Sequence, residues 1–248
     1  MRASLICVYN DLYCLETKLM RSVNNQLNDI EIILIDNTTG VYSSAVNALE
    51  YGISRSTTDI YIFAHQDVYI KEKDGLERFA RIIQEGRDGD VFGVAGSIEC
   101  VRQNIGLFTS GDVFVDSLKE CDWNLKKVSC LDEFMFGMKK VTYYQHPFNG
   151  NLCDNWHLYC AEMCLHARKN GSSIWIAPIQ VHHFSNGNIT NEYMSCLMRI
   201  AQEYRGDFKY IWTTAYKVRS NRLYINVLVA AWRLNRWIKK TLSSISIR

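Results

Sequence analysis

The sequence predicts an α/β fold with a central, mostly parallel β-sheet. Three apolar runs are typical of buried strands, namely SLICVY (4–9), EIILID (31–36) and DIYIFA (59–64). Two segments between them carry apolar residues at helical spacing, 12–27 and 43–54, and the second begins with serine. Strands that are apolar on both faces suit the middle of a sheet that helices cover. Because strand and helix alternate, we expect parallel strands joined by right-handed crossovers.

The middle of the chain predicts a smaller antiparallel piece beside this sheet. Further strands are expected at 91–98, 111–116, 126–140 and 173–181. A helix is predicted over 155–171, because Gly171 can end it and basic residues occupy its last turn. His182 and His183 follow the last of these strands.

The composition is that of a globular protein with ample material for a core. The chain has 248 residues, of which 48% are hydrophobic and 22% charged, and only 2 prolines, so no obvious linker divides it. The nine cysteines are odd in number and scattered, which favours reduced thiols over the disulfide scaffold of a secreted domain. No secretory signal and no run of about 18 apolar residues is recognised. These features predict a cytoplasmic protein.

Charge is divided unevenly along the chain. Residues 217–248 carry eight Lys or Arg and no Asp or Glu, so residues 1–216 hold 20 of the 28 basic and all 26 acidic residues. The acidic body argues against nucleic acid as a partner. We therefore expect a globular domain over 1–216 and a basic amphipathic helical tail over 217–248. An apolar stripe flanked by basic residues and tryptophans suits an anionic membrane surface on the cytoplasmic side, and the alternative is a helix packed on the domain or on a dimer partner.

Polar residues follow each of the first three strands. They are Asn10-Asp11, Asp36-Asn37 and His65-Gln66-Asp67. The carboxyl ends of parallel strands share one edge of a sheet, where ligands bind. The alternative for each carboxylate is a turn or a helix cap, although a cap at Asp67 requires no histidine two residues earlier. No G-x-G-x-x-G or Walker A loop follows the first strand, which excludes the common dinucleotide and P-loop signatures.

Six segments in this order resemble the nucleotide-sugar glycosyltransferases of the GT-A fold, in the broad family 2 group. They are SLICVYND, EIILIDN, DIYIFAHQDVYI, LDEFMFGMKK, WHLYCAEMCLHARKNG and VHHFSNG. The resemblance covers residues 3–190 and is strongest to the bacterial glycosyltransferase-like branch used in surface polysaccharide assembly. It implies a GT-A fold, a nucleoside-diphosphate sugar as donor, with UDP the commonest in the family, and inverting transfer to a glycan or polyprenyl-linked acceptor.

The same resemblance places the nucleotide sugar and a metal ion at the strand ends. The donor is expected to contact Tyr9, Asn10, Asp11, Asp36, Asn37, His65 and Gln66. Segment 59–70 occupies the position of the D-x-D metal motif, with His65 in place of the first acid. Asp67 and His183 are expected to hold Mn²⁺ or Mg²⁺, which offsets the charge of the departing diphosphate, and a nitrogen ligand favours Mn²⁺. The alternative is that His65 does not ligate the metal and instead contacts the ribose or one of the ligating residues.

Inverting transfer also requires a base for the acceptor hydroxyl. The resemblance places this base on the 155–171 helix, at Glu162, where relatives usually carry Asp; the alternative is a solvated helix glutamate. The acceptor is expected to contact Asp132, Glu133, Trp156 and His157. The alternative for Asp132 and Glu133 is that they only cap a hairpin. Asp154 is expected to be the N-cap of the helix.

Four potential zinc ligands share one face of that helix. They are Cys153, His157, Cys160 and Cys164. Strung over about 16 Å of helix they cannot converge on one ion, so a stripe that faces the core is expected in place of a zinc site.

Two other functions remain open. A sugar nucleotidyltransferase also combines an α/β sheet with an acidic metal site, but YNDLYCLETK after the first strand lacks the glycine of a phosphate-binding loop. A domain that binds a nucleotide sugar or glycan without turnover is compatible with the missing first Asp of the metal motif.

Overall fold

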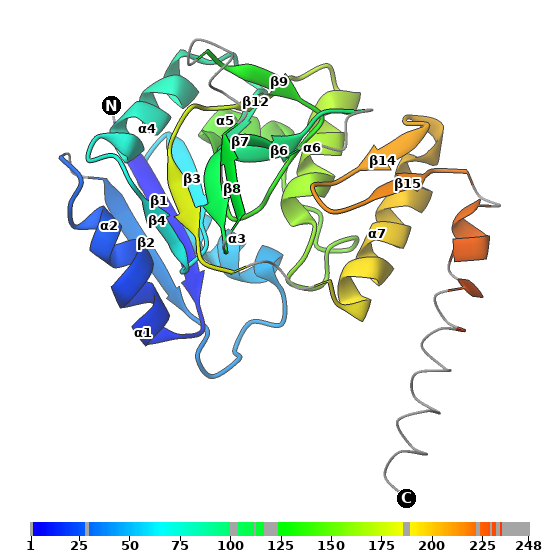
Figure 1. The fold of residues 1–248 in the computed structure, drawn as a ribbon, viewed down its shortest axis with the longest axis horizontal. Helices are drawn as coiled ribbons and strands as arrows, with labels where there is room; N and C mark the ends of the chain where they lie inside the picture. Colours follow the sequence, from blue (N-terminus) through cyan, green and yellow to red (C-terminus); the bar gives the residue numbers. More distant parts are fainter. Residues whose placement is uncertain are drawn as a thin grey trace, which may run out of the picture.

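The computed structural model describes residues 2–27, 30–99, 104–111, 113–116, 124–185, 189–221, 224–228, 230, 231 and 234. A seven-stranded sheet forms the centre (Figure 1), in the order β2 (Glu31–Asp36), β1 (Ala3–Tyr9), β3 (Ile60–Ala64), β11 (Met135–Lys139), β5 (Val91–Gly93), β12 (Ile174–Ile176) and β9 (Lys126–Val128). A second sheet contains β10 (Cys130–Leu131), β6 (Ala95–Ser97), β7 (Asn104–Ser110), β13 (Val181–His183) and β4 (Val68–Ile70), with β8 (Val113–Asp116) paired to β7.

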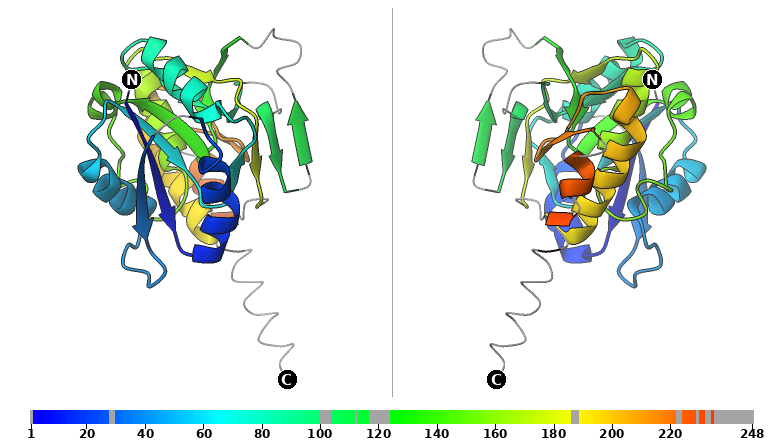
Figure 2. Two further views of the ribbon diagram at one scale, coloured as in Figure 1. Left: turned by 90° about the vertical axis from the view of Figure 1, so that its left-hand side faces the viewer. Right: turned by 90° about the vertical axis from the view of Figure 1, so that its right-hand side faces the viewer.

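Helices lie on both sides of the large sheet (Figure 2). The helical segments are α1 (Leu12–Leu15), a π-helical stretch η1 (Glu16–Met20), α2 (Arg21–Val23), α3 (Ala45–Arg55), α4 (Gly75–Glu85), α5 (Lys140–Gln145), α6 (Tyr159–Lys169), α7 (Asn191–Glu203) and the 3₁₀ turn η3 (Tyr204–Gly206). Alternate side chains of β1 enter opposite cores, because consecutive strand residues point to opposite faces. Ile6 packs in one core with Val46 of α3, and Leu5 packs in the other with Leu15 of α1.

The first three strands run parallel and in register, as the sequence predicts. Tyr9 of β1 is paired with Asp36 of β2, and Ile6 of β1 with Phe63 of β3. Their carboxyl ends therefore lie at one edge of the sheet. Beyond β3 the sheet is mixed, since β11 runs antiparallel to both β3 and β5. The α/β fold expected from the sequence, a parallel sheet joined to an antiparallel piece, is confirmed.

The single strand expected over 91–98 is two strands in different sheets. β5 pairs with β11 and β12, and after Val94 the chain continues as β6, which pairs with β7 and β10. A Cβ atom on Gly96 would stand 2.3 Å from the carbonyl oxygen of Cys130. The close approach of these two backbones requires glycine at this position. This contact is between strands distant in sequence, so the local pattern could not reveal the break.

The helix expected over 155–171 begins four residues later, at Tyr159. Leu158 precedes it with a φ of 65° and a ψ of 9°, which is left-handed backbone. The expectation that Asp154 caps this helix is wrong, because its side chain bonds the guanidinium of Arg199. Helices α4 and α7 and strand β7 are not among the elements expected from the sequence.

Helix α6 buries a carboxyl group on the side where it meets η3. Glu162 is 1% exposed, so the alternative of a solvated glutamate is wrong. Its Oε1 accepts a hydrogen bond of 2.7 Å from the Tyr204 hydroxyl, and its Oε2 has no hydrogen-bond partner among the described residues. Burial raises the pKa of Glu162 to about 7, and the hydrogen bond from Tyr204 and the nearby Asn149 side chain oppose this rise only in part.

The boundary expected between residues 216 and 217 divides a β-hairpin. β14 (Tyr210–Trp212) pairs with β15 (Lys217–Arg219), and Trp212 lies opposite Lys217. Residues 224–228 are helical, and Ile225 is buried in the core that also contains α6 and α7. Most of the expected amphipathic tail, including Trp232, Trp237 and the basic residues 233–240, lies outside the described residues. The membrane-binding tail therefore stays a prediction.

Within the described part of the chain, no helix combines the length and the apolar character needed to cross a bilayer.

We predict that Glu162→Gln alters the pH dependence of stability. Between the unfolded pKa of about 4.5 and the folded pKa of about 7, the wild-type protein progressively loses the stability that the protonated carboxyl contributes. That loss is at most about 3 kcal/mol at pH 8, because each pKa unit corresponds to about 1.4 kcal/mol. Glutamine does not titrate, so the melting temperature of the variant relative to wild type should rise between pH 5 and pH 8. The exposed Glu85→Gln is the control, and a difference that is constant with pH would contradict the prediction.

Candidate functional site

The carboxyl ends of β1, β2 and β3 enclose one side of a cavity of about 610 Å³. Its lining includes Tyr9 and Asn10 after β1, Asn37 and Thr38 after β2, and His65, Gln66 and Asp67 after β3. Tyr42, Trp156 and Tyr159 complete much of the wall. The volume lies in the range that holds a nucleotide-sized ligand.

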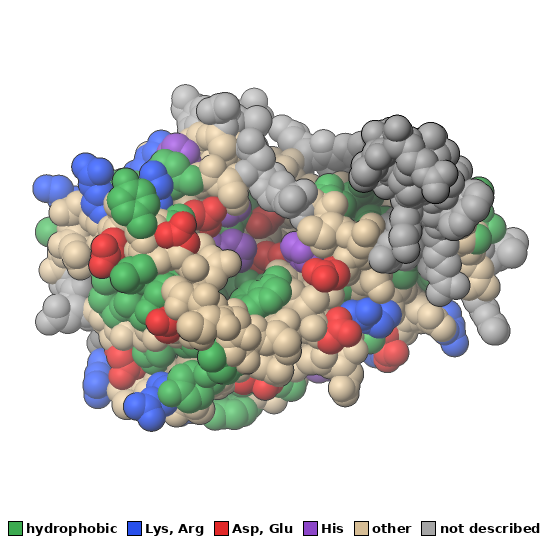
Figure 3. Space-filling model, turned by 90° about the horizontal axis from the view of Figure 1, so that it is seen from below, with side chains coloured by type: hydrophobic (Ala, Val, Ile, Leu, Met, Phe, Trp, Pro, Cys, Tyr) green, Lys and Arg blue, Asp and Glu red, His purple; other side chains and the backbone are tan. Residues whose placement is uncertain are grey.

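A second cavity of about 380 Å³ adjoins the first, since His65 and Trp156 line both. Its wall comes from the turn between β10 and β11, the segment before α6, the end of β13 and the loop after β14. The residues from these segments include Asp132, Glu133, His157, His183 and Thr214. All four residues that the sequence assigns to the acceptor therefore line this second cavity. In the surface view, histidine and acidic side chains gather in the hollow of this face (Figure 3).

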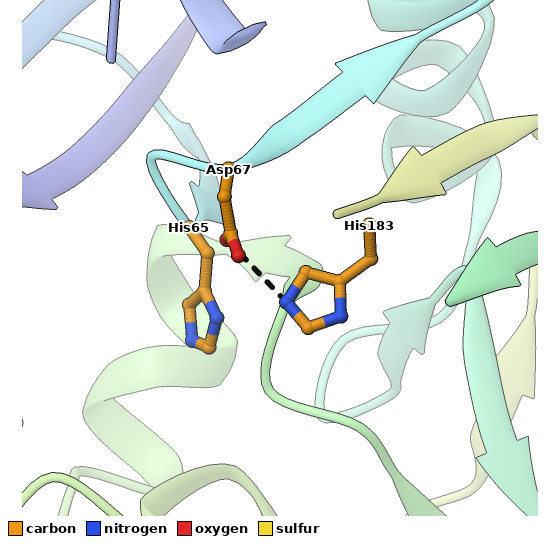
Figure 4. A group of neighbouring side chains, drawn as sticks. All are labelled: His65, Asp67 and His183. Carbon is orange, nitrogen blue, oxygen red and sulfur yellow. Dashed lines mark ion pairs between the residues drawn. The ribbon is translucent and has the colours of Figure 1, made fainter. Parts of the chain in front are cut away.

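Three potential metal ligands meet at the junction of the two cavities. One ligand atom from each of His65, Asp67 and His183 lies within 4.8 Å of the others. Figure 4 shows the Asp67 carboxylate between the two imidazoles, with His183 Nε2 at 3.4 Å from Asp67 Oδ1. The antiparallel pairing of β4 with β13 brings these residues together, because Val68 lies opposite His183. These three residues are named the HDH cluster below.

Neighbouring groups hold the HDH cluster in place. Phe134 stacks on the His183 ring with centroids 4.6 Å apart and planes inclined by 14°. The Tyr159 hydroxyl lies 3.3 Å from His65 Nε2, and the Ser185 hydroxyl lies 3.1 Å from His183 Nε2. Sequence reasoning assigned no role to Phe134, Tyr159 or Ser185. An aromatic residue on an apolar strand or helix is indistinguishable from a core residue in the sequence alone.

The protonation states of His65 and Asp67 are those that bind a cation. Burial and the neighbouring His183 lower the pKa of His65 to about 4, so the imidazole is neutral at pH 7. Burial alone would raise the pKa of Asp67, but the hydrogen bond and charge of His183, together with His65, hold that pKa below the usual range. A neutral imidazole and an ionised carboxylate are the ligating forms of these side chains.

The donor set of the HDH cluster fits a divalent cation. Ligand atoms about 2.1–2.6 Å from a common Mg²⁺ or Ca²⁺ lie up to roughly twice that distance apart, and the observed separations are below 4.8 Å. Imidazole nitrogens beside a carboxylate favour Mn²⁺ or another first-row metal over Mg²⁺. Among the described residues, this is the one group of three such side chains with that spacing. His65 therefore joins Asp67 and His183 as a candidate ligand, which the sequence had left as an alternative.

The residues expected to contact a nucleotide fall into two groups. Tyr9, Asn10 and Asn37 line the first cavity, whereas Asp11 and Asp36 are absent from its lining. The Asp11 side chain caps α1 by accepting a hydrogen bond from the Cys14 amide. Asp36 is exposed, and its Oδ1 accepts a hydrogen bond from the Thr38 amide. For these two carboxylates the alternative of caps and turns describes the contacts observed.

Glu162 does not line either cavity. It lines a different one, of about 410 Å³, with Asn149, His166, Lys169 and Tyr204. The expectation that Glu162 faces the acceptor does not fit this geometry. Tyr159 and Ala161 line the first and second cavities respectively, so Glu162 lies on another side of α6.

Neither of the two adjoining cavities has a lysine or arginine in its described lining. The charged or chargeable groups there are Asp67, Asp132, Glu133 and the histidines His65, His157 and His183. An anionic ligand would therefore meet acidic groups and neutral donors unless a cation bound with it.

Comparison with solved structures shows a shared fold. GalNAc-T7 with UDP, GalNAc and Mn²⁺ superposes with a TM-score of 0.58 at 11% identity, covering 82% of this chain and 48% of that one. TarS of S. aureus in complex with UDP-GlcNAc gives 0.53 at 14%, covering 84% and 68%. The mannosyltransferase PcManGT from Pyrobaculum calidifontis, with GDP-Man and Mn²⁺, gives 0.52 at 12%, covering 81% and 61%. The chain thus spans about half to two thirds of the lengths of these glycosyltransferases.

No curated protein sequence matches this chain. The family model described as "Glycosyltransferase like family" matches residues 3–204, which contain both cavities except the loop at 213–215. Because that match covers most of the chain, and the fold is that of GT-A glycosyltransferases, the chain belongs to the glycosyltransferase-like family.

Proposed function

We propose that this chain transfers a sugar from a nucleoside-diphosphate donor to a hydroxyl of an acceptor, with a divalent cation bound at the HDH cluster. One observation carries the proposal. Two adjoining cavities, one of nucleotide size, meet at His65, which together with Asp67 and His183 forms a cluster with the spacing of cation ligands. The first cavity would hold the nucleotide, and the second would hold the acceptor.

The charge of the donor supports a need for metal. A nucleoside diphosphate leaves as a multiply charged anion, and the described lining of both cavities provides no lysine or arginine. His65, Asp67 and His183 would hold the cation, which would supply the positive charge that stabilises the leaving diphosphate. Two of the solved structures with the same fold contain Mn²⁺ together with a nucleotide or a nucleotide sugar, which supports this proposal.

The nucleobase of the donor and the identity of the acceptor stay predictions. The relatives bind UDP in one case, UDP-GlcNAc in another and GDP-Man in a third, so they do not distinguish uridine from guanosine. The preference for UDP, the inverting outcome, a glycan or polyprenyl-linked acceptor, and a role in surface polysaccharide synthesis follow from the family resemblance.

Gln66, which lines the first cavity, also joins the two turns at its edge. Its side-chain oxygen accepts hydrogen bonds from the backbone amides of Asn10 (2.9 Å) and Asp11 (3.0 Å). Its side-chain nitrogen donates to Asn10 Oδ1 at 2.7 Å. These contacts join the turn after β1 to the turn after β3 at the place where the nucleotide would lie. We propose that Gln66 positions Asn10, and that this is its principal role in donor binding.

We predict that nucleotide binding requires both Mn²⁺ and Asp67. UDP or GDP at 100 times its dissociation constant should stabilise the protein by about 2.7 kcal/mol, which raises the melting temperature by roughly 5–10 °C. The shift should vanish without Mn²⁺ and in Asp67→Asn, which lacks the carboxylate charge. Asp59→Asn, at the exposed opposite end of the same strand, should bind as wild type does. A shift that is indifferent to metal would remove the cation from the proposal, and no shift with any nucleotide would refute the donor site.

We predict that Gln66→Leu weakens nucleotide affinity about tenfold. The variant loses three hydrogen bonds across the two turns. Tenfold corresponds to about 1.4 kcal/mol of binding, so we expect roughly one bond's worth of energy, about 1 kcal/mol, to be lost from binding and the rest from the stability of the turns. Isothermal titration with the nucleotide and Mn²⁺ measures the change. The exposed Gln84→Leu is the control. An affinity equal to that of wild type would show that the bridge between the turns does not support binding.

A further inference from the structure

Sugar transfer to a hydroxyl releases a proton, and the base that the sequence suggested, Glu162, lies outside both cavities. We propose that Glu133 is the general base of this reaction; the inference rests on the proposed function. The acceptor hydroxyl loses its proton to Glu133 Oε1. At the same time its oxygen forms a bond to the anomeric carbon of the donor sugar. The bond from the anomeric carbon to the phosphate oxygen breaks, and its electron pair leaves with the nucleoside diphosphate.

Glu133 lies in the acceptor cavity at a defined place relative to the HDH cluster. It occupies the short turn between β10 and β11, and its side chain is 18% exposed, so a ligand in the second cavity can reach it. The next residue, Phe134, stacks on His183, and its carbonyl oxygen accepts a hydrogen bond of 2.9 Å from the His65 amide. The backbone that carries Glu133 is therefore tied to two of the three cluster residues.

Unusual backbone geometry directs a hydrogen bond to this carboxylate. Leu158 donates its amide to Glu133 Oε2 at 2.8 Å. Leu158 is the one residue other than glycine with a positive φ among the described residues, and it directly precedes the 11-residue helix α6. Left-handed backbone at a leucine is unfavourable and persists where surrounding contacts require it, often at functional sites. The helix N-terminus also favours a negative charge at this position.

One oxygen of Glu133 stays available for a proton. No hydrogen bond to Oε1 is present among the described residues, and the nearest basic group, His157 Nδ1, lies 4.0 Å away. The neighbouring Asp132 differs, because its Oδ1 accepts from the Phe134 amide and its Oδ2 accepts from the Thr214 hydroxyl at 2.8 Å. Of the two adjacent carboxylates in the lining of the second cavity, Glu133 is thus the one with an oxygen that accepts no hydrogen bond from the described residues.

The environment also makes Glu133 a stronger base than an ordinary glutamate. Burial raises the pKa of Glu133, the charge of Asp132 raises it further, and the Leu158 amide opposes the rise. A carboxylate with a raised pKa holds a transferred proton more strongly than an ordinary glutamate does.

Release of nucleoside diphosphate to water tests the proposal without a known acceptor. UDP-glucose, UDP-galactose, UDP-GlcNAc, UDP-GalNAc and GDP-mannose are each incubated with the full chain and Mn²⁺, and released UDP or GDP is measured. Glu133→Gln should release at least about a hundredfold less nucleotide than wild type, the usual effect of losing a general base. Its nucleotide affinity, measured by titration, should stay within about twofold of wild type. The reason is that the Glu133 side chain lies outside the cavity proposed for the nucleotide. Glu162→Gln, which makes the same change at a glutamate outside both cavities, is the matched control and should release nucleotide as wild type does.

Two outcomes would overturn the assignment of Glu133 as the general base. Unchanged release by Glu133→Gln overturns the assignment, and so does a wild-type protein that binds a donor but releases no nucleotide to water, because an exposed base would activate water. If Glu133→Gln does not fold, Glu133→Asp takes its place, with reduced release at unchanged affinity expected. Failure of wild type to bind any nucleotide would refute the proposed function instead, and affinity measured beside release distinguishes the two failures.

Discussion

The antiparallel pairing of β11 with β3 is the constraint on which the candidate site depends. Phe136 lies opposite Phe63 and their rings stack with centroids 4.9 Å apart, while the His65 amide bonds the Phe134 carbonyl oxygen just beyond the strand end. This register places the acidic turn of residues 132–133 beside His65. Without it, the polar strand ends of the parallel half of the sheet would not have the second cavity beside them.

Both cavities lack basic side chains in their described walls, so a bound anion would need positive charge from elsewhere. Their described walls combine carboxylates and imidazoles and contain no lysine or arginine. A diphosphate is poorly accommodated there alone, since like charges in a partly buried site repel strongly. Binding of donor and cation should therefore be thermodynamically linked, each raising the affinity for the other. The acidic balance of residues 1–216 is consistent with a site that recruits its positive charge from solution.

The local pattern predicted the parallel strands well, and it predicted the details of the site less well. β-branched runs at β1, β2 and β3 have a strong period and clear polar ends, so their boundaries agree with the structure to within one residue. Helix α4 was missed although Leu76, Phe79, Ala80 and Ile83 have helical spacing and are all buried. The start of α6 was misplaced because the left-handed backbone of Leu158 is supported by contacts such as that with Glu133, which no local sequence pattern records.

The sequence by itself determined the fold class, the edge of the sheet that carries the site and the residues Asp67 and His183 as potential cation ligands. The fold class and the edge rest on periodicity and on the order of strand ends, which are local properties of the chain, whereas the two ligands rest on the resemblance of its motifs to a known family. Only the tertiary structure decided that His65 completes the HDH cluster, that Glu162 lies in a separate cavity and that Glu133 lines the second of the two adjoining cavities. The direction of a side chain depends on the register between strands and on where a helix begins, and both are set by contacts between residues far apart in sequence.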